Sequence, residues 1–264
     1  MALENTMIKS FMSMGLLIGA LGLTGCATGP NPSDPFEHAN RQIYKFNDSI
    51  DKTVAQPIAR TYNRHTPNII KQGIRNFFQN LGMISTTLNN IFQLKLHKTP
   101  DDLLRLAINT TAGVGGLFDI ASRMGIPKNN EDFGQTLGYW GVRPGPYFMI
   151  PFIGPNTLRD GIGRPIDVIV NPVSSLIDNS STTYALSGIQ IVDTRARLLT
   201  VTDIVDQQFD PYTFIRDNYL KRRENQILDQ KPPPNSSSPG AIVPQKSLLE
   251  MEKELFGDEP LDQF

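Results

Sequence analysis

Apolar residues recur at every third or fourth position along two long stretches, which predicts amphipathic helices over residues 35–55 and 67–93. The second stretch is the more regular, because its apolar positions alternate steps of four and three. Those positions are Ile70, Ile74, Phe77, Leu81, Ile84, Leu88 and Ile91. The opposite face is mostly uncharged and polar, with Lys71, Gln72, Gln79, Thr86 and Asn89. The pattern favours a helical protein whose helices each carry one apolar side.

Shorter patterns predict further helices from residue 100 to about 113, in a short stretch after Pro165, over 183–199 and over 211–229. Four helices share one expected start: a polar N-cap residue followed by proline at the first helical position, where the missing amide hydrogen costs nothing. The four pairs are Asp34-Pro35, Thr66-Pro67, Thr99-Pro100 and Asp210-Pro211. Glu37 follows Asp34 by three residues, which resembles a capping box.

Glycine and proline recur every few residues between positions 113 and 165, and this density predicts that no long regular element forms there. We expect no strand pair and see no internal repeat. Large apolar side chains such as Tyr139 and Trp140 lie between the glycines, so the segment is expected to be ordered. A long irregular segment inside a compact domain is usually functional.

The N-terminus has the layout of a signal peptide: Lys9 precedes an apolar stretch over residues 11–23, which is shorter than the roughly 20 residues a membrane span needs. Leu23-Thr24-Gly25-Cys26 resembles the bacterial lipobox at all four positions. Cys26 is therefore the expected lipid anchor; the alternative is an ordinary cleaved signal in which Cys26 is incidental.

Four regions follow from these patterns. Residues 1–25 are expected to be a lipoprotein signal peptide and 26–33 a short lipid-anchored linker. Residues 34–230 form the helical domain. Residues 231–264 begin with a Pro/Ser linker and are expected to be largely disordered.

Composition narrows the classes of function. The net charge of -1 gives no reason to expect a nucleic-acid partner, and 39% hydrophobic residues suffice for a packed core but not for a multi-span membrane protein. The only cysteine is Cys26, in the leader region, so no disulfide is expected in the folded part.

No catalytic residue, metal site or cofactor is expected. His97 and Asp102 have the H-x4-D spacing of an acyltransferase dyad, but Asp102 is better explained as a first-turn carboxylate that favours the helix dipole. The chain has no G-x-S-x-G motif and only three histidines. The glycines at 113–116 are not followed by the Lys-Ser/Thr of a nucleotide loop.

These observations indicate a helical, anchored, non-catalytic protein held against a membrane. Amphipathic helices with an aromatic-rich segment suit a body partly sunk in one leaflet. Irregular backbone at membrane depth is tolerated only where it is buried or lines a wet cavity. The Gly/Pro-rich segment is thus a candidate passage wall; the competing interpretation is that it packs as ordinary surface loops.

Several motifs, in matching order and spacing over residues 34–229, resemble the MlaA family, also called VacJ lipoproteins. They are Asp34-Pro35-Phe36-Glu37, Asn40-Arg41, Tyr44-Lys45-Phe46-Asn47, Phe133-Gly134-Gln135-Thr136-Leu137-Gly138, Gly145-Pro146-Tyr147, Pro151-Phe152-Ile153-Gly154-Pro155, Leu158-Arg159-Asp160, Thr194-Arg195-Ala196-Arg197-Leu198-Leu199, Asp210-Pro211-Tyr212, Tyr219 and Arg222-Arg223. His38-Ala39 departs from the family pattern, where Gly-Phe or similar is expected before Asn40.

The resemblance implies an all-α, ring-like body of amphipathic helices in the inner leaflet of the outer membrane, with a central channel. It further implies that mislocalised phospholipids leave the outer leaflet through this channel for a periplasmic carrier resembling MlaC, and that a trimeric porin scaffolds the ring. Ala27, which is not Asp, suits outer-membrane sorting. A structural lipoprotein that scaffolds porins without transport is the alternative, and a lipid-modifying enzyme is a distant third.

The resemblance and the residue types suggest the site residues. Tyr44, Phe46 and Asn47 are expected to set the orientation or the gate of the ring. The channel needs a polar lining beside an apolar side, because a buried headgroup without polar partners is costly. Candidate lining residues from the Gly/Pro-rich segment are Tyr139, Arg143, Gly145, Tyr147, Pro151, Phe152, Arg159 and Asp160.

Overall fold

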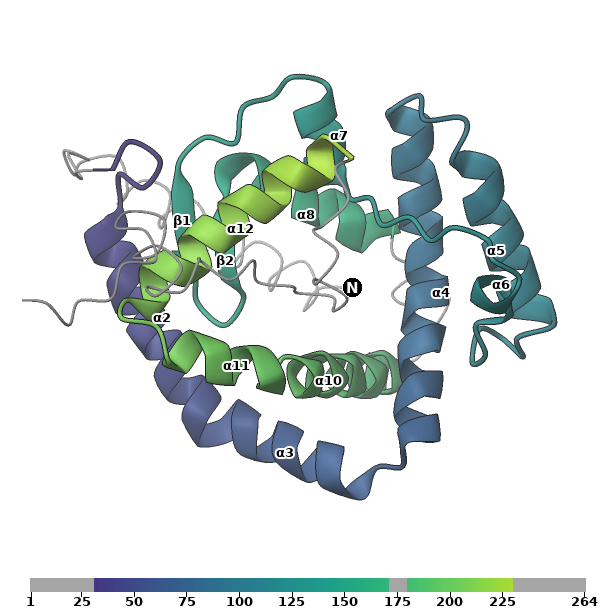
Figure 1. The fold of residues 1–264 in the computed structure, drawn as a ribbon, viewed down its shortest axis with the longest axis horizontal. Coiled ribbons are helices and arrows are strands. Elements are labelled where there is room, and N and C mark those ends of the chain that lie inside the picture. Colours follow the sequence, from purple (N-terminus) through teal and green to yellow (C-terminus); the bar gives the residue numbers. More distant parts are fainter. Residues whose placement is uncertain (1–30, 171–179, 230–264) are drawn as a thin grey trace, which may run out of the picture.

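The computed structural model describes residues 31–170 and 180–229, and in this part of the chain helices follow one another around a ring (Figure 1). The elements, in chain order, are α2 (Glu37–Ile50), η1 (Asp51–Ala55), α3 (Gln56–His65), α4 (Asn68–Phe92), α5 (Thr99–Thr111), α6 (Ile120–Arg123), α7 (Phe133–Tyr139), β1 (Tyr147–Ile150), β2 (Gly154–Thr157), α8 (Leu158–Val170), α10 (Ser180–Arg197), α11 (Leu199–Asp206) and α12 (Pro211–Ile227). The expected signal peptide, Cys26, most of the linker and the tail lie outside the described residues.

The ring is framed by two long helical paths. The path from α2 through α3 forms one side, α4 forms the opposite side, and α7, α8 and α12 lie between their upper ends in Figure 1. The helices α10 and α11 cross the ring, with α10 packed against both α3 and α4. The helices α5 and α6 pack together outside α4. The predicted all-α, ring-like body is confirmed.

The first helix is longer than the sequence predicts. Instead of ending at residue 55, the helical path continues from α2 through the π-helical turn η1 into α3, which ends at His65. Pro57 lies in the first turn of α3, directly after η1. Proline lacks an amide hydrogen and its ring crowds the preceding turn, so a wider turn there lets the helix continue past it.

The other helices are largely as predicted. The prediction of 67–93 corresponds to α4, and that of 211–229 to α12. The stretch predicted over 183–199 is divided between α10, which ends at Arg197, and α11, which begins at Leu199. The N-cap prediction holds for Asp210, which accepts a hydrogen bond from the Thr213 amide at 3.2 Å.

Asp34 is not a helix cap, so the predicted capping box is wrong. The helix begins at Glu37 with no side-chain cap, and Asp34 is buried. Its carboxylate accepts hydrogen bonds from Asn40 at 2.8 Å and from the Tyr212 hydroxyl at 2.5 Å, and Arg216 approaches to 3.2 Å. These distant partners outcompete the local cap. Helices α4 and α5 also begin without a side-chain cap from Thr66 or Thr99.

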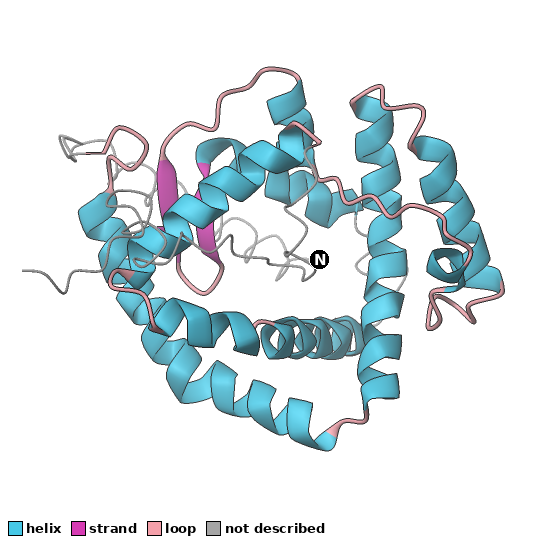
Figure 2. Ribbon diagram, in the orientation of Figure 1, coloured by secondary structure: helices cyan, strands magenta, loops and turns pink. Residues whose placement is uncertain are grey.

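The expectation that no strand pair forms between residues 113 and 165 is wrong. The strands β1 and β2 form an antiparallel hairpin, in magenta in Figure 2, in which Met149 lies opposite Pro155. The amide of Met149 bonds the side chain of Asn40 on α2 rather than β2, so this register demands no amide hydrogen from Pro155. Helix α8 likewise begins at Leu158, before Pro165, and contains that proline.

On α4, polar side chains are buried and several large apolar side chains are exposed. Helix α4 buries Asn80, Thr86, Thr87, Asn89 and Asn90, while Ile69, Ile70, Ile91 and Phe92 are exposed. Two of these buried amides bond side chains on neighbouring helices: Asn90 donates to Asp102 at 2.6 Å, and Asn89 accepts from Thr136 at 2.7 Å. No helix in the described part of the chain has the length and hydropathy of a membrane span.

Candidate functional site

A cavity of about 660 Å³ lies between four parts of the ring. They are α2 with η1, the tip of the β-hairpin (residues 151–153, between β1 and β2), α10 with α11, and α12. One part of its lining is apolar, with Ile50, Met149, Phe152, Ile153, Ile191, Leu198, Val201, Val205 and Ile215. Another part is polar, with Tyr44, Asn47, Asp48, Asp51, Arg195, Thr202, Asp206, Asn218, Tyr219 and Arg222. Its volume is within the range of sites for small organic ligands. We refer to it as the amphipathic cavity.

A bidentate ion pair ties two sides of the amphipathic cavity together. Arg195 of α10 donates from Nε and Nη2 to the two carboxylate oxygens of Asp51 in η1, at 2.5 and 2.6 Å, and also reaches Thr202 at 2.9 Å. Burial opposes ionisation of Asp51, but the hydrogen bonds from Arg195 and Gln56 outweigh it and lower the pKa of the carboxyl. Paired, planar contacts of this kind fix orientation as well as charge.

Arg222 is the second guanidinium on the cavity wall. Its side chain is exposed. Among the described residues no carboxylate forms an ion pair with it. This wall thus offers a positive charge that has no ion-pair partner in the described part of the chain, next to apolar side chains from α11 and α12.

The hairpin tip is held against α2 by residues that the sequence singles out. Asn47 donates to the Ile150 carbonyl at 3.0 Å and accepts from the Phe152 amide at 2.8 Å. The Phe46 and Phe152 rings meet edge to face with their centroids 5.3 Å apart. Tyr44 stacks edge to face on Tyr212, and burial raises its pKa to about 12. The structure thus brings Tyr44, Asn47 and Phe152 together at the amphipathic cavity.

The other candidate lining residues do not line the amphipathic cavity. Tyr147 has no exposed surface and packs with Met149 and Tyr212 in the small hydrophobic core. Arg159 and Asp160 are each only 5% exposed, so they present little surface to a lumen. The exposed candidates, which do not line the amphipathic cavity, are Tyr139, Arg143, Gly145 and Pro151.

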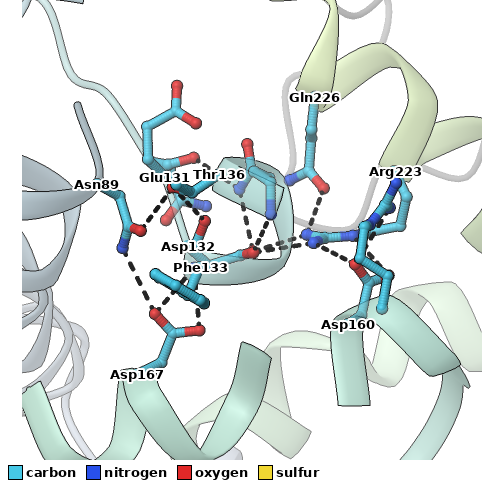
Figure 3. Close-up of polar contacts among 12 residues, drawn as sticks. Asn89, Glu131, Asp132, Phe133, Thr136, Asp160, Asp167, Arg223 and Gln226 are labelled. Atoms are coloured by element: carbon cyan, nitrogen blue, oxygen red, sulfur yellow. Dashed lines mark hydrogen bonds and ion pairs between the residues drawn. The ribbon is translucent and has the colours of Figure 1, made fainter. Parts of the chain in front are cut away.

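Asp160 belongs to an ion network that joins α7, α8 and α12 (Figure 3). Arg159 pairs with Asp160 at 3.1 Å. Arg223 donates to both oxygens of Asp132, at 2.6 and 2.8 Å, and to both oxygens of Asp160, at 3.0 and 2.9 Å. Burial opposes the charge on Asp132, but Arg223 outweighs it and lowers the pKa to about 2. Gly134 completes the site, because a Cβ there would lie 2.6 Å from Asp160 and 2.7 Å from Arg223. The network thus holds α12 against the start of α7 and against α8.

Sequence reasoning missed the α10–α11 wall of the amphipathic cavity. Arg195 and Leu198 lie in the Thr194–Leu199 motif, so the motif could have pointed to them. Asp51 and Val205 carry no comparable signal, because each becomes a wall residue only through packing of helices far apart in the chain.

The acyltransferase dyad suggested by the H-x4-D spacing is not assembled. His97 is exposed, whereas Asp102 is fully buried and accepts hydrogen bonds from Asn90 at 2.6 Å and Asn129 at 2.8 Å. Burial raises the pKa of the Asp102 carboxyl. Among residues 31–170 and 180–229, no three His, Cys, Asp or Glu side chains form a group that could hold a metal ion.

The chain is similar to proteins of one bacterial family. The family model described as MlaA lipoprotein matches residues 32–226. An uncharacterized protein of Rickettsia prowazekii is 35% identical over 196 residues, 74% of this chain and 78% of the relative. The intermembrane phospholipid transport system lipoprotein MlaA of Escherichia coli (strain K12) is 34% identical over 219 residues, 79% of this chain and 86% of the relative.

A solved structure gives the same relationship in three dimensions. It comes from a study titled "Structural basis for maintenance of bacterial outer membrane lipid asymmetry", and it superimposes with a TM-score of 0.67 at 30% identity. The match covers 74% of this chain and 99% of that one. The ring of helices, the family match over residues 32–226 and the relatives above agree: this chain belongs to the MlaA lipoprotein family.

Proposed function

We propose that the protein is a lipid-anchored outer-membrane component that removes mislocalised phospholipids from the outer leaflet and passes them towards a periplasmic carrier. The observation that carries the proposal is the amphipathic cavity, which combines apolar and charged lining inside a ring of helices. A phospholipid joins a charged headgroup to two apolar chains, so its passage needs both kinds of lining. An unpartnered polar group in hydrocarbon costs several kcal/mol.

The outer surface of the ring supports a position in the inner leaflet of the outer membrane, facing the periplasm. Exposed apolar side chains on α3 and α4 include Ile58, Ile69, Ile70 and Phe92. Helices of this kind bury their apolar sides in the region between headgroups and acyl chains. Acylation of Cys26 would add roughly 0.8 kcal/mol per buried methylene, enough for lasting attachment when more than one chain is present.

Within the amphipathic cavity, the groups divide by chemistry. Arg222 offers its charge to a headgroup phosphate, and Val201, Val205 and Ile215 offer apolar contact to acyl chains. Phe46 and Asn47 hold the hairpin tip, and Tyr44 lines the cavity; together these three residues control the passage. The family relationship supports two protein partners, a trimeric outer-membrane porin and a periplasmic carrier resembling MlaC. No catalytic step is part of this proposal.

The decisive experiment narrows the cavity without touching its charges. Val201→Trp places a large ring on the α11 wall, and Ile162→Trp adds the same ring at an exposed position of α8 outside the cavity. Each variant replaces the native protein in cells, and outer-leaflet phospholipid is measured with a membrane-impermeant label. We expect phospholipid to accumulate with Val201→Trp and to stay at the native level with Ile162→Trp.

A scaffold that carries no lipid predicts a different result. If Val201→Trp is folded, reaches the outer membrane at the native level and leaves lipid asymmetry unchanged, the passage is overturned and the scaffold is favoured. Co-purified phospholipid gives a second measurement, since the native protein should carry more lipid than Val201→Trp after identical detergent extraction.

A further inference from the structure

A second cavity, of about 500 Å³, lies between α4, α10 and the loop that contains Lys128. It shares no lining residue with the amphipathic cavity, although α10 contributes to both. Ile191 and Arg195 face the amphipathic cavity, whereas Gln190, Asp193 and Arg197 face the second one. The two cavities are thus separate, and binding to the second one does not depend on a passage through the first.

The lining of the second cavity is strongly positive. Arg75, Lys128 and Arg197 provide three positive charges, and Asp193 is the single carboxylate in the lining. Asp193 is 3% exposed and is already shared: Arg197 Nε approaches it to 3.2 Å, Arg75 Nε to 3.9 Å, and the Tyr62 hydroxyl donates to it at 3.2 Å. One carboxylate cannot balance three cations, so the lining keeps an excess of two positive charges.

Two hydrogen-bond donors of this lining also lack an acceptor among the described residues. The Nε atoms of Arg75 and Arg197 are enclosed, and neither has a hydrogen-bond partner among the described residues, despite their approach to Asp193. Within residues 31–170 and 180–229, the exposed Lys128 donates only to the neutral amide oxygen of Gln79. An incoming anion would relieve both the charge excess and the missing hydrogen bonds.

We infer that this cavity binds a phosphate-type oxyanion, in a site distinct from the amphipathic cavity. Guanidinium forks and an ammonium group are the protein donors that match the several oxygens of a phosphate. The volume exceeds that of a bare phosphate and lies in the range of organic ligands. Phe78 and Met83 add apolar lining on α4, which suits the first acyl-chain carbons of a phospholipid. Free phosphate offers the same oxygens without that apolar part.

The test uses the full-length lipidated protein in a non-ionic detergent and three probes. The probes are short-chain phosphatidylglycerol below its micellar concentration, the matching short-chain diacylglycerol without a phosphate, and inorganic phosphate. Binding is measured by calorimetry in the Val201→Trp background, which narrows the amphipathic cavity. We expect phosphatidylglycerol to bind, diacylglycerol not to bind, and the affinity for phosphatidylglycerol to fall as the salt concentration rises.

Substitutions in the lining decide where the probe binds. Lys128→Gln and Arg197→Gln should each weaken phosphatidylglycerol binding about tenfold, the scale of one lost charge-assisted hydrogen bond. Arg123→Gln, which removes an exposed charge outside both cavities, should leave it unchanged. Lys128 does not pair with buried Asp193, so Lys128→Gln remains informative even if Arg197→Gln fails to fold.

The outcomes separate the two sources of the anion. Binding of phosphatidylglycerol alone assigns the site to a lipid headgroup, and equally tight binding of inorganic phosphate with the same dependence on Lys128 assigns it to free phosphate. The inference is overturned if neither phosphatidylglycerol nor inorganic phosphate binds. It is also overturned if Lys128→Gln binds phosphatidylglycerol as tightly as the protein that keeps Lys128. Neither overturning result bears on the passage, which is tested by lipid asymmetry in cells.

Discussion

Asn40 and Asn47 lie seven residues apart on α2, and each side-chain amide bonds both a carbonyl and an amide hydrogen of the hairpin. Asn40 donates to the Tyr147 carbonyl at 3.2 Å and accepts from the Met149 amide at 2.8 Å. Asn47 makes the same pair with Ile150 and Phe152, at 3.0 and 2.8 Å. Seven residues are close to two helical turns, so both side chains point the same way. They give the outer edge of β1 the partners that a neighbouring strand would provide.

Asn47→Ala should loosen the hairpin tip without unfolding the ring. The change leaves the Ile150 carbonyl and the Phe152 amide without their partner, which costs about 1–2 kcal/mol of unfolding free energy at a partly exposed position. Hydrogen exchange at the Phe152 amide should accelerate, and Ser49→Ala, on the exposed side of α2, should change neither quantity. Unaltered exchange at Phe152 in Asn47→Ala would show that the amide pair does not hold the tip.

Gly134→Ala and Gly82→Ala should have opposite effects on stability. A Cβ on Gly134 would lie 2.6 Å from Asp160 and 2.7 Å from Arg223, so the network in Figure 3 must shift, with an expected loss of about 2–4 kcal/mol. Gly82 lies inside α4, and a Cβ there would meet nothing within 4 Å beyond its own helix backbone, so alanine should add about 0.5–1 kcal/mol. Denaturant unfolding measures the unfolding free energy of both variants. Changes of the same sign in the two variants would contradict the prediction.

Stability should fall as the pH drops from about 4 towards 2. Asp51, Asp132 and Asp160 have lowered pKa values in the folded protein, with that of Asp132 at about 2, because arginines hold their charged forms. A carboxyl whose pKa is lower in the folded state stabilises the fold above the unfolded pKa, and that stabilisation is lost as the pH falls through the folded value. Unfolding free energies measured across this range give the slope.

The matched variant for the pH dependence is Arg223→Met, which removes the partner of Asp132 and Asp160. With Arg223 absent, these two carboxyls should lose most of their lowered pKa, so the acid slope should flatten. Arg123→Met, at an exposed position, should keep the native slope. A slope in Arg223→Met as steep as that of the native protein would mean that other carboxylates control acid unfolding.

Cys26→Ser should abolish membrane anchoring. The change removes the sulfur that would carry the lipid, so the chain should remain uncleaved or become soluble and should not maintain lipid asymmetry. Growth with radioactive palmitate followed by purification measures the modification. Equal label on the native protein and on Cys26→Ser would contradict the assignment of the anchor.

The sequence alone determined the elements whose pattern depends on residues within one or two helical turns of each other. The alternating apolar steps of residues 70–91 predicted α4 almost to the residue, since side chains three and four apart share one face of a helix. Asp210 and Pro211 predicted the start of α12, because an N-cap bonds amides only three residues away. The order of the motifs, together with the lipobox, indicated the family and the expected anchor.

Tertiary structure decided everything that depends on distant partners. Pro155 enters a strand because Asn40 and Asn47, 103 to 109 positions from the atoms they bond, fix β1 in a register that demands no amide from it. Asp34 bonds Tyr212 and Arg216 instead of capping the helix. Asp160 is buried against Arg223, and Arg159 is buried beside Asp160, so neither faces a lumen. Local spacing records which side chains share a helix face. Only packing decides which faces meet, and therefore which residues surround a cavity.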